Sequence, residues 1–415
     1  MKSRPRAKLC PSAERSASSA DAAGSTQRER SVIEQSVQLG HAVIDRYLRA
    51  TQRAPSTQPS SPPAAPQPAR PQPRLASSLV GRALGRYKRL VHRRLRERWR
   101  QQRWPASLLR LAADYPRRGG RTLRASLCIA TAEAFGAPPE LSLDSAVSIE
   151  LLHNAFLVHD DIEDDSEERR GRPTLHRTHG VADALNAADA LTVMGMEALL
   201  ANGSTLGPRL SQHVLQETHA MARETVEGQA LELTFRSRKA SLVTAANYLR
   251  MTLKKTCWYT VIHPCRVGAL IGSGSASDPA RFVKYGFFLG AAFQIQDDLL
   301  NLVGDPARYG KERNGDLFEG KRTLLLSHTF ARAGARERRR LDQLLSLPRK
   351  RRTSRDVRWI RTLIEEHDSI AYARSVACAL AGAASHEFDR AYADALPGSA
   401  LAFLAALPRW VIERT

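Results

Sequence analysis

Residues 144–161 read DSAVSIELLHNAFLVHDD, and residues 281–303 read RFVKYGFFLGAAFQIQDDLLNLV. Both stretches are longer than an ordinary strand and mostly apolar, which is typical of buried helices. Each runs into a pair of aspartates, so acidic groups are expected near the ends of two core helices. From about residue 76 onward, helical periodicity continues between Gly, Pro and Asn breaks. The sequence therefore predicts an all-α fold with one large helical domain over residues 76–415.

The N-terminal part of the chain has a different composition. It predicts a disordered basic tail over residues 1–30, a short amphipathic helix over 31–52 and a Pro-rich linker over 53–75. No apolar run approaches the roughly 20 residues that cross a bilayer. The five cysteines form no C-x-x-C pair, which favours a reducing, cytoplasmic location. The net charge of +21 indicates attraction to polyanions, but it does not distinguish nucleic acid, anionic lipid and phosphorylated metabolites as partners.

Two acidic clusters are the main candidates for a site. Asp160 and Asp164 are four residues apart and share a helix face, with Asp161 beside them. The second cluster repeats the spacing with Asp297, Asp298 and Asn301. Crowded carboxylates repel each other unless a cation lies between them, and oxygen ligands favour Mg²⁺. The alternative is two solvated helix ends, although acids there oppose the helix dipole at a cost of about 0.3–1 kcal/mol each.

Basic residues accompany both clusters. Arg169 and Arg170 follow the first cluster, and residues 117–124 (RRGGRTLR) combine arginines with glycines that let the backbone approach an anion. Further cations come later in the chain at Lys254, Lys255, Lys311 and Lys321. This arrangement fits two polyanions, one held through metal ions and one held directly by Arg and Lys. A solvated basic face is the alternative for any one of these groups.

Several motifs resemble one enzyme family in the same order along the chain. VHDDIEDDSEERRGRPTLH and FQIQDDLLNLVGD resemble the first and second aspartate-rich motifs of the trans-prenyl diphosphate synthases. GGRTLR, IELLHNAFLVHDD, GQALEL, KKTCWYT and GKERNGDLFEGKRTL also resemble blocks of that family. The resemblance runs from about residue 100 to the C-terminus. It implies an isoprenoid synthase-like helical bundle around a central apolar cavity.

The resemblance also implies a role for each matching residue. Asp160, Asp161 and Asp164 would bind Mg²⁺ on one wall, and Asp297, Asp298 and Asn301 on the other, with about three ions in all. The allylic diphosphate would be held by Arg169, Lys255 and Lys321. Isopentenyl diphosphate would be held by Gly120, Arg121, Arg124, His153 and Arg170. Thr256 and Gln294 would line the reaction centre, Gln229 and Glu232 would support the first metal cluster, and Lys311 would face the leaving diphosphate.

Three positions depart from the family pattern. Arg121 replaces a usual Lys, Ala125 a usual Pro, and Asn301 the last aspartate of the second motif. Because Asn301 is a neutral oxygen ligand, weaker metal binding is expected on that wall. The H-x-x-H pair His176 and His179 could suggest zinc, but no third ligand stands at a recognised spacing.

The implied reaction is a head-to-tail condensation of isopentenyl diphosphate with an allylic diphosphate, in a family whose members are usually homodimers. A terpene cyclase is the nearest rival enzyme, and a non-catalytic basic subunit is a rival of another class. The arginine-rich residues 86–100 could bind an anionic membrane. No nucleic-acid-binding motif is present, so nucleic acid is not expected as a partner.

Product length should depend on the residues one helical turn before the first aspartate. Phe156 lies four residues before Asp160, hence about 6 Å away along the same helix face. Ala155 beside it is small where short-chain members often carry a second aromatic. One aromatic residue favours geranylgeranyl diphosphate (C20), with farnesyl diphosphate or a longer product as the alternatives.

Overall fold

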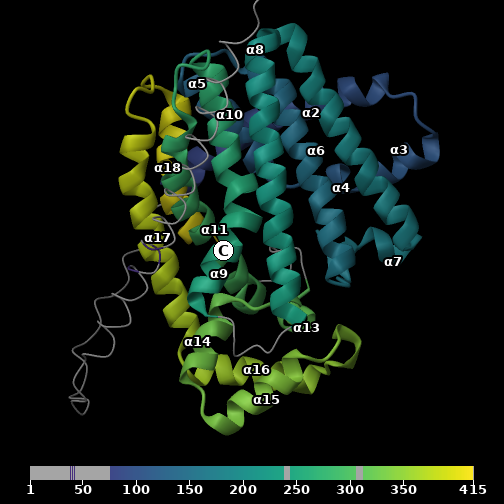
Figure 1. Cartoon of the computed structure of the whole chain (residues 1–415), viewed down its shortest axis with the longest axis vertical. Helices are drawn as coiled ribbons and strands as arrows, with labels where there is room; N and C mark the ends of the chain where they lie inside the picture. The colour runs from purple at the N-terminus through teal and green to yellow at the C-terminus, as the bar shows by residue number, and fades with distance from the viewer. Residues whose placement is uncertain are drawn as a thin grey trace, which may run out of the picture.

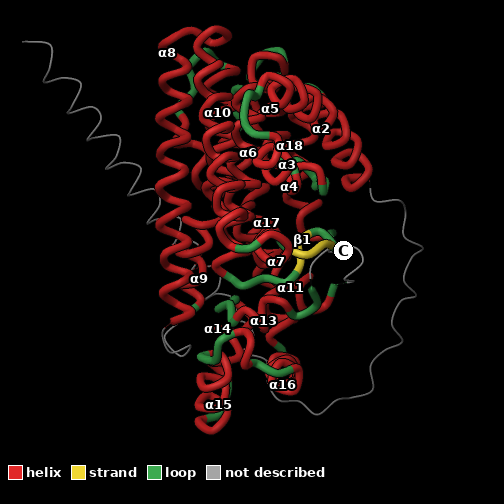
Figure 2. Tube along the Cα trace, turned by 90° about the vertical axis from the view of Figure 1, so that its right-hand side faces the viewer, coloured by secondary structure: helices red, strands yellow, loops and turns green. Residues whose placement is uncertain are grey.

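Helices account for nearly all of the computed structural model, which describes residues 38, 40 and 42, 75–237, 244–304 and 312–414 (Figures 1 and 2). The first half contains α2 (Leu75–Gln101), α3 (Ala106–Ala112), α4 (Asp114–Arg117), α5 (Leu123–Ala134), α6 (Pro139–Glu163), α7 (Leu175–His179) and α8 (Val181–Ser237). The second half contains α9 (Ala245–Thr252), α10 (His263–Gly272), α11 (Phe282–Val303), α13 (Gly315–Glu319), α14 (Leu324–Arg332), α15 (Ala335–Leu345), α16 (Ser354–Glu366), α17 (Ser369–Ala391) and α18 (Ser399–Glu413). A π-helix, η2 (Leu253–Ile262), and two 3-10 turns, η3 (Pro279–Arg281) and η4 (Arg349–Arg351), complete the helices. Strands β1 (Glu168–Arg169) and β2 (Arg172–Pro173) form a small antiparallel hairpin.

The all-α prediction is confirmed, and both quoted stretches are core helices. Residues 144–161 lie in α6, which packs most extensively on α8, and residues 281–303 give η3 and α11, which packs on α17 and η2. Phe287 and Leu151 are fully buried, as expected for helices that are apolar on nearly every side. The tail, helix and linker expected before residue 75 fall almost entirely outside the described residues, so those boundaries stay predictions.

Local sequence explains where several helices begin and turn. Pro139 stands in the first turn of α6, where its missing N–H costs nothing. Thr353 caps α16 and exchanges hydrogen bonds with Asp356. Gly207, at a φ of 75°, reverses the chain within α8 immediately before Pro208, so the two arms of α8 run in opposite directions (Figure 1).

Two of the described helices, α6 and α8, are long and apolar enough by composition alone to cross a membrane. The apolar window of α6 is 78% buried inside the protein, which identifies it as a core helix. That of α8 is 50% buried, because one side of α8 carries exposed apolar residues.

The second arm of α8 fixes the position of η2. A Cβ built on Gly228 would lie 2.2 Å from the backbone nitrogen of Lys255, so only glycine allows the two backbones to come this close. π-helical segments are frequent at functional sites. Here η2 presents Lys255, Thr256 and Tyr259 to one cavity.

Candidate active site

A cavity of about 540 Å³ lies among α5, α6, η2, α11 and the segment that follows α13. Its wall contains most of the site residues expected from the sequence: Gly120, Arg121, Arg124, His153, Asp160, Arg169, Arg170, Lys255, Thr256, Gln294, Asp297, Asp298 and Lys321. The fold thus brings together motifs that are 201 residues apart in the chain, as Gly120 and Lys321 are. Lys311, expected beside the leaving diphosphate, lies outside the described residues.

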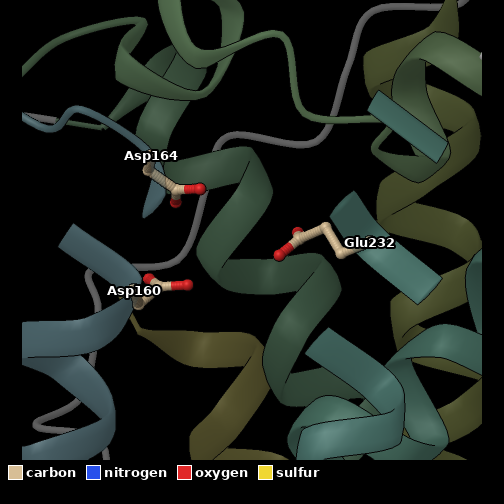
Figure 3. Close-up of side chains that lie close together, drawn as sticks. All are labelled: Asp160, Asp164 and Glu232. Atoms are coloured by element: carbon tan, nitrogen blue, oxygen red, sulfur yellow. The ribbon is translucent and has the colours of Figure 1, made fainter. Parts of the chain in front are cut away.

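The first acidic cluster is completed by a residue from α8 (Figure 3). Carboxylate oxygens of Asp160, Asp164 and Glu232 all lie within 4.8 Å of one another. The i, i+4 aspartates therefore do share a face, and Glu232 points toward them from across the site. Three carboxylates this close favour a bound cation, and their hard oxygen donors fit Mg²⁺.

Asp161 is turned away from these three carboxylates although it follows Asp160 in the chain. Its carboxylate accepts hydrogen bonds from Arg169 and from the Tyr115 hydroxyl, and its exposed fraction is 1%. Successive helix residues point about 100° apart. In this structure Asp161 therefore positions the Arg169 guanidinium instead of joining Asp160 and Asp164.

Cations pair with the first cluster directly. The Lys255 ammonium lies 2.7 Å from Asp160 Oδ1 and also contacts Glu232, while Lys321 lies 2.7 Å from Asp164 Oδ2. Burial opposes the ionisation of Asp160, but Lys255 and Lys321 hold its pKa well below the usual range. Burial and the neighbouring Asp160 charge raise the pKa of Asp164 to about 7. Arg236 also contacts Asp164, so the cluster is balanced by positive charge.

The second acidic cluster lies on α11 and uses a residue that the sequence did not identify. Asp298 accepts hydrogen bonds from Tyr248 Oη at 2.7 Å and Gln294 Nε2 at 2.8 Å. Burial, followed by the charge of Asp316, raises its pKa to about 8. Asp316 and Asp297 line the same cavity. Asp316 stands in the GKERNGDLFEGKRTL block, but its position follows only from the fold of α13.

Asn301 and Gln229 do not line the cavity. The Asn301 side-chain oxygen accepts a hydrogen bond from the Asp316 backbone N–H at 3.1 Å, so Asn301 anchors the start of α13. Gln229 donates to Glu163 at the end of α6. Asn301 and Gln229 therefore contact residues that adjoin the acidic clusters, namely Asp316 and Glu163, and do not face the cavity themselves.

A basic group of residues, Arg121, Arg124 and Arg170, lines the same cavity and is called its basic end here. Gly120 has a φ of 138°, a backbone conformation that favours glycine, and the Arg170 guanidinium would lie only 2.9 Å from a Cβ there. The Arg124 guanidinium donates to Tyr259 Oη at 2.8 Å and lies 3.4 Å from His153 Nε2. Burial, and then the Arg124 charge, lowers the pKa of His153 well below its usual value, so this ring is neutral. Arginines with so few acidic partners can bind an anion without a metal ion.

His176 and His179 give no sign of a zinc site. In the described part of the chain, the group of metal-ligand side chains that comes together is Asp160, Asp164 and Glu232. His179 is exposed, and the acid nearest to His176 is Asp165 at 3.9 Å.

Comparisons with known proteins agree with this geometry. The family model described as polyprenyl synthetase matches residues 106–364. A short chain isoprenyl diphosphate synthase of Methanothermobacter thermautotrophicus is 33% identical over 294 residues, covering 71% of this chain and 87% of that protein. A geranylgeranyl pyrophosphate synthase of Geoglobus acetivorans is 33% identical over 58% of this chain and 74% of that protein. The crystal structure of geranylgeranyl pyrophosphate synthetase from Pyrococcus horikoshii superposes with a TM-score of 0.71 at 31% identity, covering 81% of this chain and 99% of the other.

Proposed function

Because the chain belongs to the polyprenyl synthetase family and is a prenyltransferase, we propose that its main product is geranylgeranyl diphosphate, the C20 compound. The names of two similar proteins support this length, since both are geranylgeranyl diphosphate synthases. Neither Ala155 nor Phe156, the residues expected to set product length, is among the residues that line the cavity. Farnesyl diphosphate is the alternative product.

The observation that carries the function is one cavity lined by carboxylates of both acidic clusters together with Arg and Lys side chains. Asp160 and Asp164, with Glu232 beside them, would hold Mg²⁺ on the α6 side, and Asp297 and Asp298 on the α11 side. When bound, about three Mg²⁺ ions would supply positive charge to the allylic diphosphate and so weaken its C–O bond. Family members depend on Mg²⁺, and the carboxylate oxygens here suit that ion.

In this proposal the Arg and Lys side chains of the cavity form two groups, each of which binds a different substrate. Lys255, Lys321 and Arg169 bind the oxygens of the allylic diphosphate, while Arg121, Arg124 and Arg170 hold isopentenyl diphosphate without metal. The double bond of isopentenyl diphosphate attacks the allylic cation, and the departing diphosphate accepts the proton that is lost. Apolar side chains deeper in the cavity exclude water, which would otherwise quench the cation.

One assay tests this proposal. Purified protein is incubated with Mg²⁺, isopentenyl diphosphate and each of the C5, C10 and C15 allylic primers, and products are sized after dephosphorylation. A dominant C20 alcohol is expected. A dominant C15 alcohol would show that farnesyl diphosphate is the main product. The absence of any condensation product would overturn the proposed function.

We also propose a homodimer formed through α8. The exposed large apolar residues of this helix are Val181, Leu185, Val193, Met196, Leu200, Leu215, Val226 and Leu233. Leu200 is 73% exposed and Met196 54%, which is unusual for side chains on a single surface of a monomer. Both arms of α8 contribute exposed apolar residues, and in an isologous dimer this surface of one copy would pack on the same surface of the other.

A second proposed partner is an anionic membrane surface, which a cytoplasmic enzyme would contact peripherally. One face of α2 carries exposed arginines three or four residues apart: Arg82, Arg86, Arg89, Arg93, Arg96 and Arg100. Arg86 pairs with Glu133, whereas the last four have no carboxylate partner among the described residues. Arg94 and Arg98 point inward and bind Asp144, so only the outward face offers charge to lipid head groups.

Sedimentation with vesicles of anionic or zwitterionic lipid tests this contact. Changing Arg89, Arg93, Arg96 and Arg100 to Ala should abolish binding to anionic vesicles at moderate salt. The matched control changes four other exposed arginines to Ala: Arg336, Arg338, Arg339 and Arg355. Equal loss in both variants, or stronger binding to duplex DNA than to vesicles, would overturn the proposal.

A further inference from the structure

Tyr115 is a buried residue of α4 that lies outside the cavity. Its exposed fraction is 1%, and it is not among the residues that line the cavity. Because α4 packs on α6, the Tyr115 hydroxyl lies beside the Asp161 carboxylate, which is also absent from the cavity wall. Tyr115 is therefore placed to act on a bound substrate through its neighbours and not by direct contact.

The Tyr115 hydroxyl holds one oxygen of the Asp161 carboxylate. It donates a hydrogen bond to Asp161 Oδ2 at 2.5 Å, and burial, followed by the Asp161 charge, raises the pKa of Tyr115, so the hydroxyl stays protonated. Arg169 Nε lies 3.0 Å from Asp161 Oδ1 and 3.1 Å from Oδ2, and Arg169 Nη2 also contacts Oδ1. Arg169 Nη1 has no hydrogen-bond partner among the described residues. This nitrogen is left for a ligand in the cavity, whose wall includes Arg169.

The backbone carbonyl of the same tyrosine holds the next arginine. Arg170 Nη1 donates a hydrogen bond to Tyr115 O at 2.9 Å. Arg170 stands in the turn between β1 and β2 at a φ of 56°, a conformation that is uncommon for residues other than glycine. Two adjacent arginines of the hairpin are thus held by two different atoms of Tyr115, Arg170 directly and Arg169 through Asp161.

Arg118 joins the Tyr115 ring to the same hairpin. Its guanidinium carbon lies 4.6 Å from the centroid of the Tyr115 ring, and its Nη1 donates to the Arg169 carbonyl oxygen at 3.0 Å. Its Nε donates to Asp114, the first residue of α4, at 2.7 Å. A cation over the ring face and a fixed hydroxyl together restrict the orientation of the ring. The hydroxyl therefore remains directed at Asp161.

We propose that Tyr115 is a positioning residue that orients the two hairpin arginines toward two different diphosphates. Its hydroxyl, acting through Asp161, directs Arg169 toward the allylic diphosphate, and its carbonyl directs Arg170 toward isopentenyl diphosphate. This inference rests on the proposed function of the same cavity. Without the hydroxyl, Asp161 Oδ2 would be a buried acceptor that lacks this donor, which is unfavourable. The carboxylate would then turn toward the free Nη1 of Arg169 and withdraw it from the substrate.

Tyr115→Phe separates the two links, because it removes the hydroxyl and keeps the carbonyl. The KM for the allylic primer should rise about tenfold, the size of one lost hydrogen bond to a charged group, while the KM for isopentenyl diphosphate should change less than about twofold. Initial rates with each substrate varied in turn measure both constants. In an Asp161→Asn background the same substitution should add less than about twofold, because the ion pair that the hydroxyl supports is already lost.

The matched control is Tyr87→Phe. Tyr87 is also 1% exposed, its hydroxyl donates to the Glu133 carboxylate at 2.6 Å, and neither residue lines the cavity. Both substitutions should lower Tm by similar amounts, since each removes a tyrosine–carboxylate hydrogen bond, but only Tyr115→Phe should change a KM. If Tyr115→Phe does not fold, Asp161→Asn tests the same link and should raise the KM for the allylic primer more than that for isopentenyl diphosphate.

The outcomes distinguish this inference from the function on which it rests. A wild-type enzyme that condenses no substrates would overturn the proposed function. An active wild type in which Tyr115→Phe changes neither KM, or raises both equally, would overturn the positioning role alone, as would equal effects of Asp161→Asn on both constants. Full additivity of Tyr115→Phe and Asp161→Asn would overturn the action through Asp161.

Discussion

The ammonium of Lys255 lies 2.7 Å from Asp160 Oδ1, joining η2 to the end of α6 across 95 residues of sequence. The same ammonium contacts Glu232 on α8, so one lysine joins three elements at the acidic cluster. This pairing keeps Asp160 ionised, because Lys255 and Lys321 outweigh the effect of burial on its pKa. Lys255 is therefore in position to bind any diphosphate that reaches these carboxylates through metal ions.

The first prediction concerns Asp160. Asp160→Ala should lower kcat by about 10²–10³-fold, the cost of losing one major electrostatic stabiliser. A chelator should abolish activity of the wild type, and Mg²⁺ should restore it. Steady-state assays with Asp394→Ala provide the control, because Asp394 is an exposed acid that is not among the residues lining the cavity. Full turnover by chelated enzyme would contradict the metal assignment.

The second prediction separates the two substrate sites. Arg124→Ala should raise the KM for isopentenyl diphosphate more than the KM for the allylic primer, and Lys255→Ala should do the reverse. The reason is that Arg124 lies at the basic end of the cavity and Lys255 lies beside the carboxylates. Initial rates with each substrate varied in turn measure both constants. Equal effects of each substitution on the two constants would show that the sites are not separate.

The third prediction concerns the exposed face of α8. Leu200→Lys together with Met196→Lys should convert a dimer to a monomer, because two charges on each copy would be buried at the proposed interface. Light scattering coupled to gel filtration gives the mass of each species. Leu396→Lys, at an apolar residue 57% exposed outside α8, should leave the mass unchanged. A double variant that stays dimeric would place the interface elsewhere.

The fourth prediction concerns pH. The pKa of Asp298 is raised from 3.8 to about 8, chiefly by burial, so between these values the folded state binds a proton that the unfolded chain releases. The contribution of Asp298 to the unfolding free energy of the metal-free protein should therefore fall as pH rises from about 4 to 8. Asp298→Asn should flatten this slope. Urea denaturation in a chelating buffer measures it, and an unchanged slope in the variant would contradict the assignment.

Periodicity predicted the helices and spacing predicted the two acidic clusters, because both are properties of contiguous sequence, whereas the other cavity residues were expected only from the resemblance to a known family. The apolar stretch before Asp160 could only be buried as a helix, and the spacing to Asp164 placed both residues on one face. Other features depend on where distant elements pack. Tyr259 and Asp316 stand in the quoted blocks KKTCWYT and GKERNGDLFEGKRTL, but no role was expected for either residue, because their places in the cavity depend on how η2 and α13 pack. Asp161 and Asn301 resemble ligands by motif, yet their hydrogen bonds direct them to Arg169 and the start of α13.

The close approach at Gly228 has a consequence for how genetic variation in this chain is interpreted. Even an added methyl group there would overlap the Lys255 backbone and push η2 away from α8. Gly228→Ala removes no charge and no substrate contact, but it would displace the lysine that holds Asp160. In a complementation screen this conservative change would therefore score like the loss of a catalytic group.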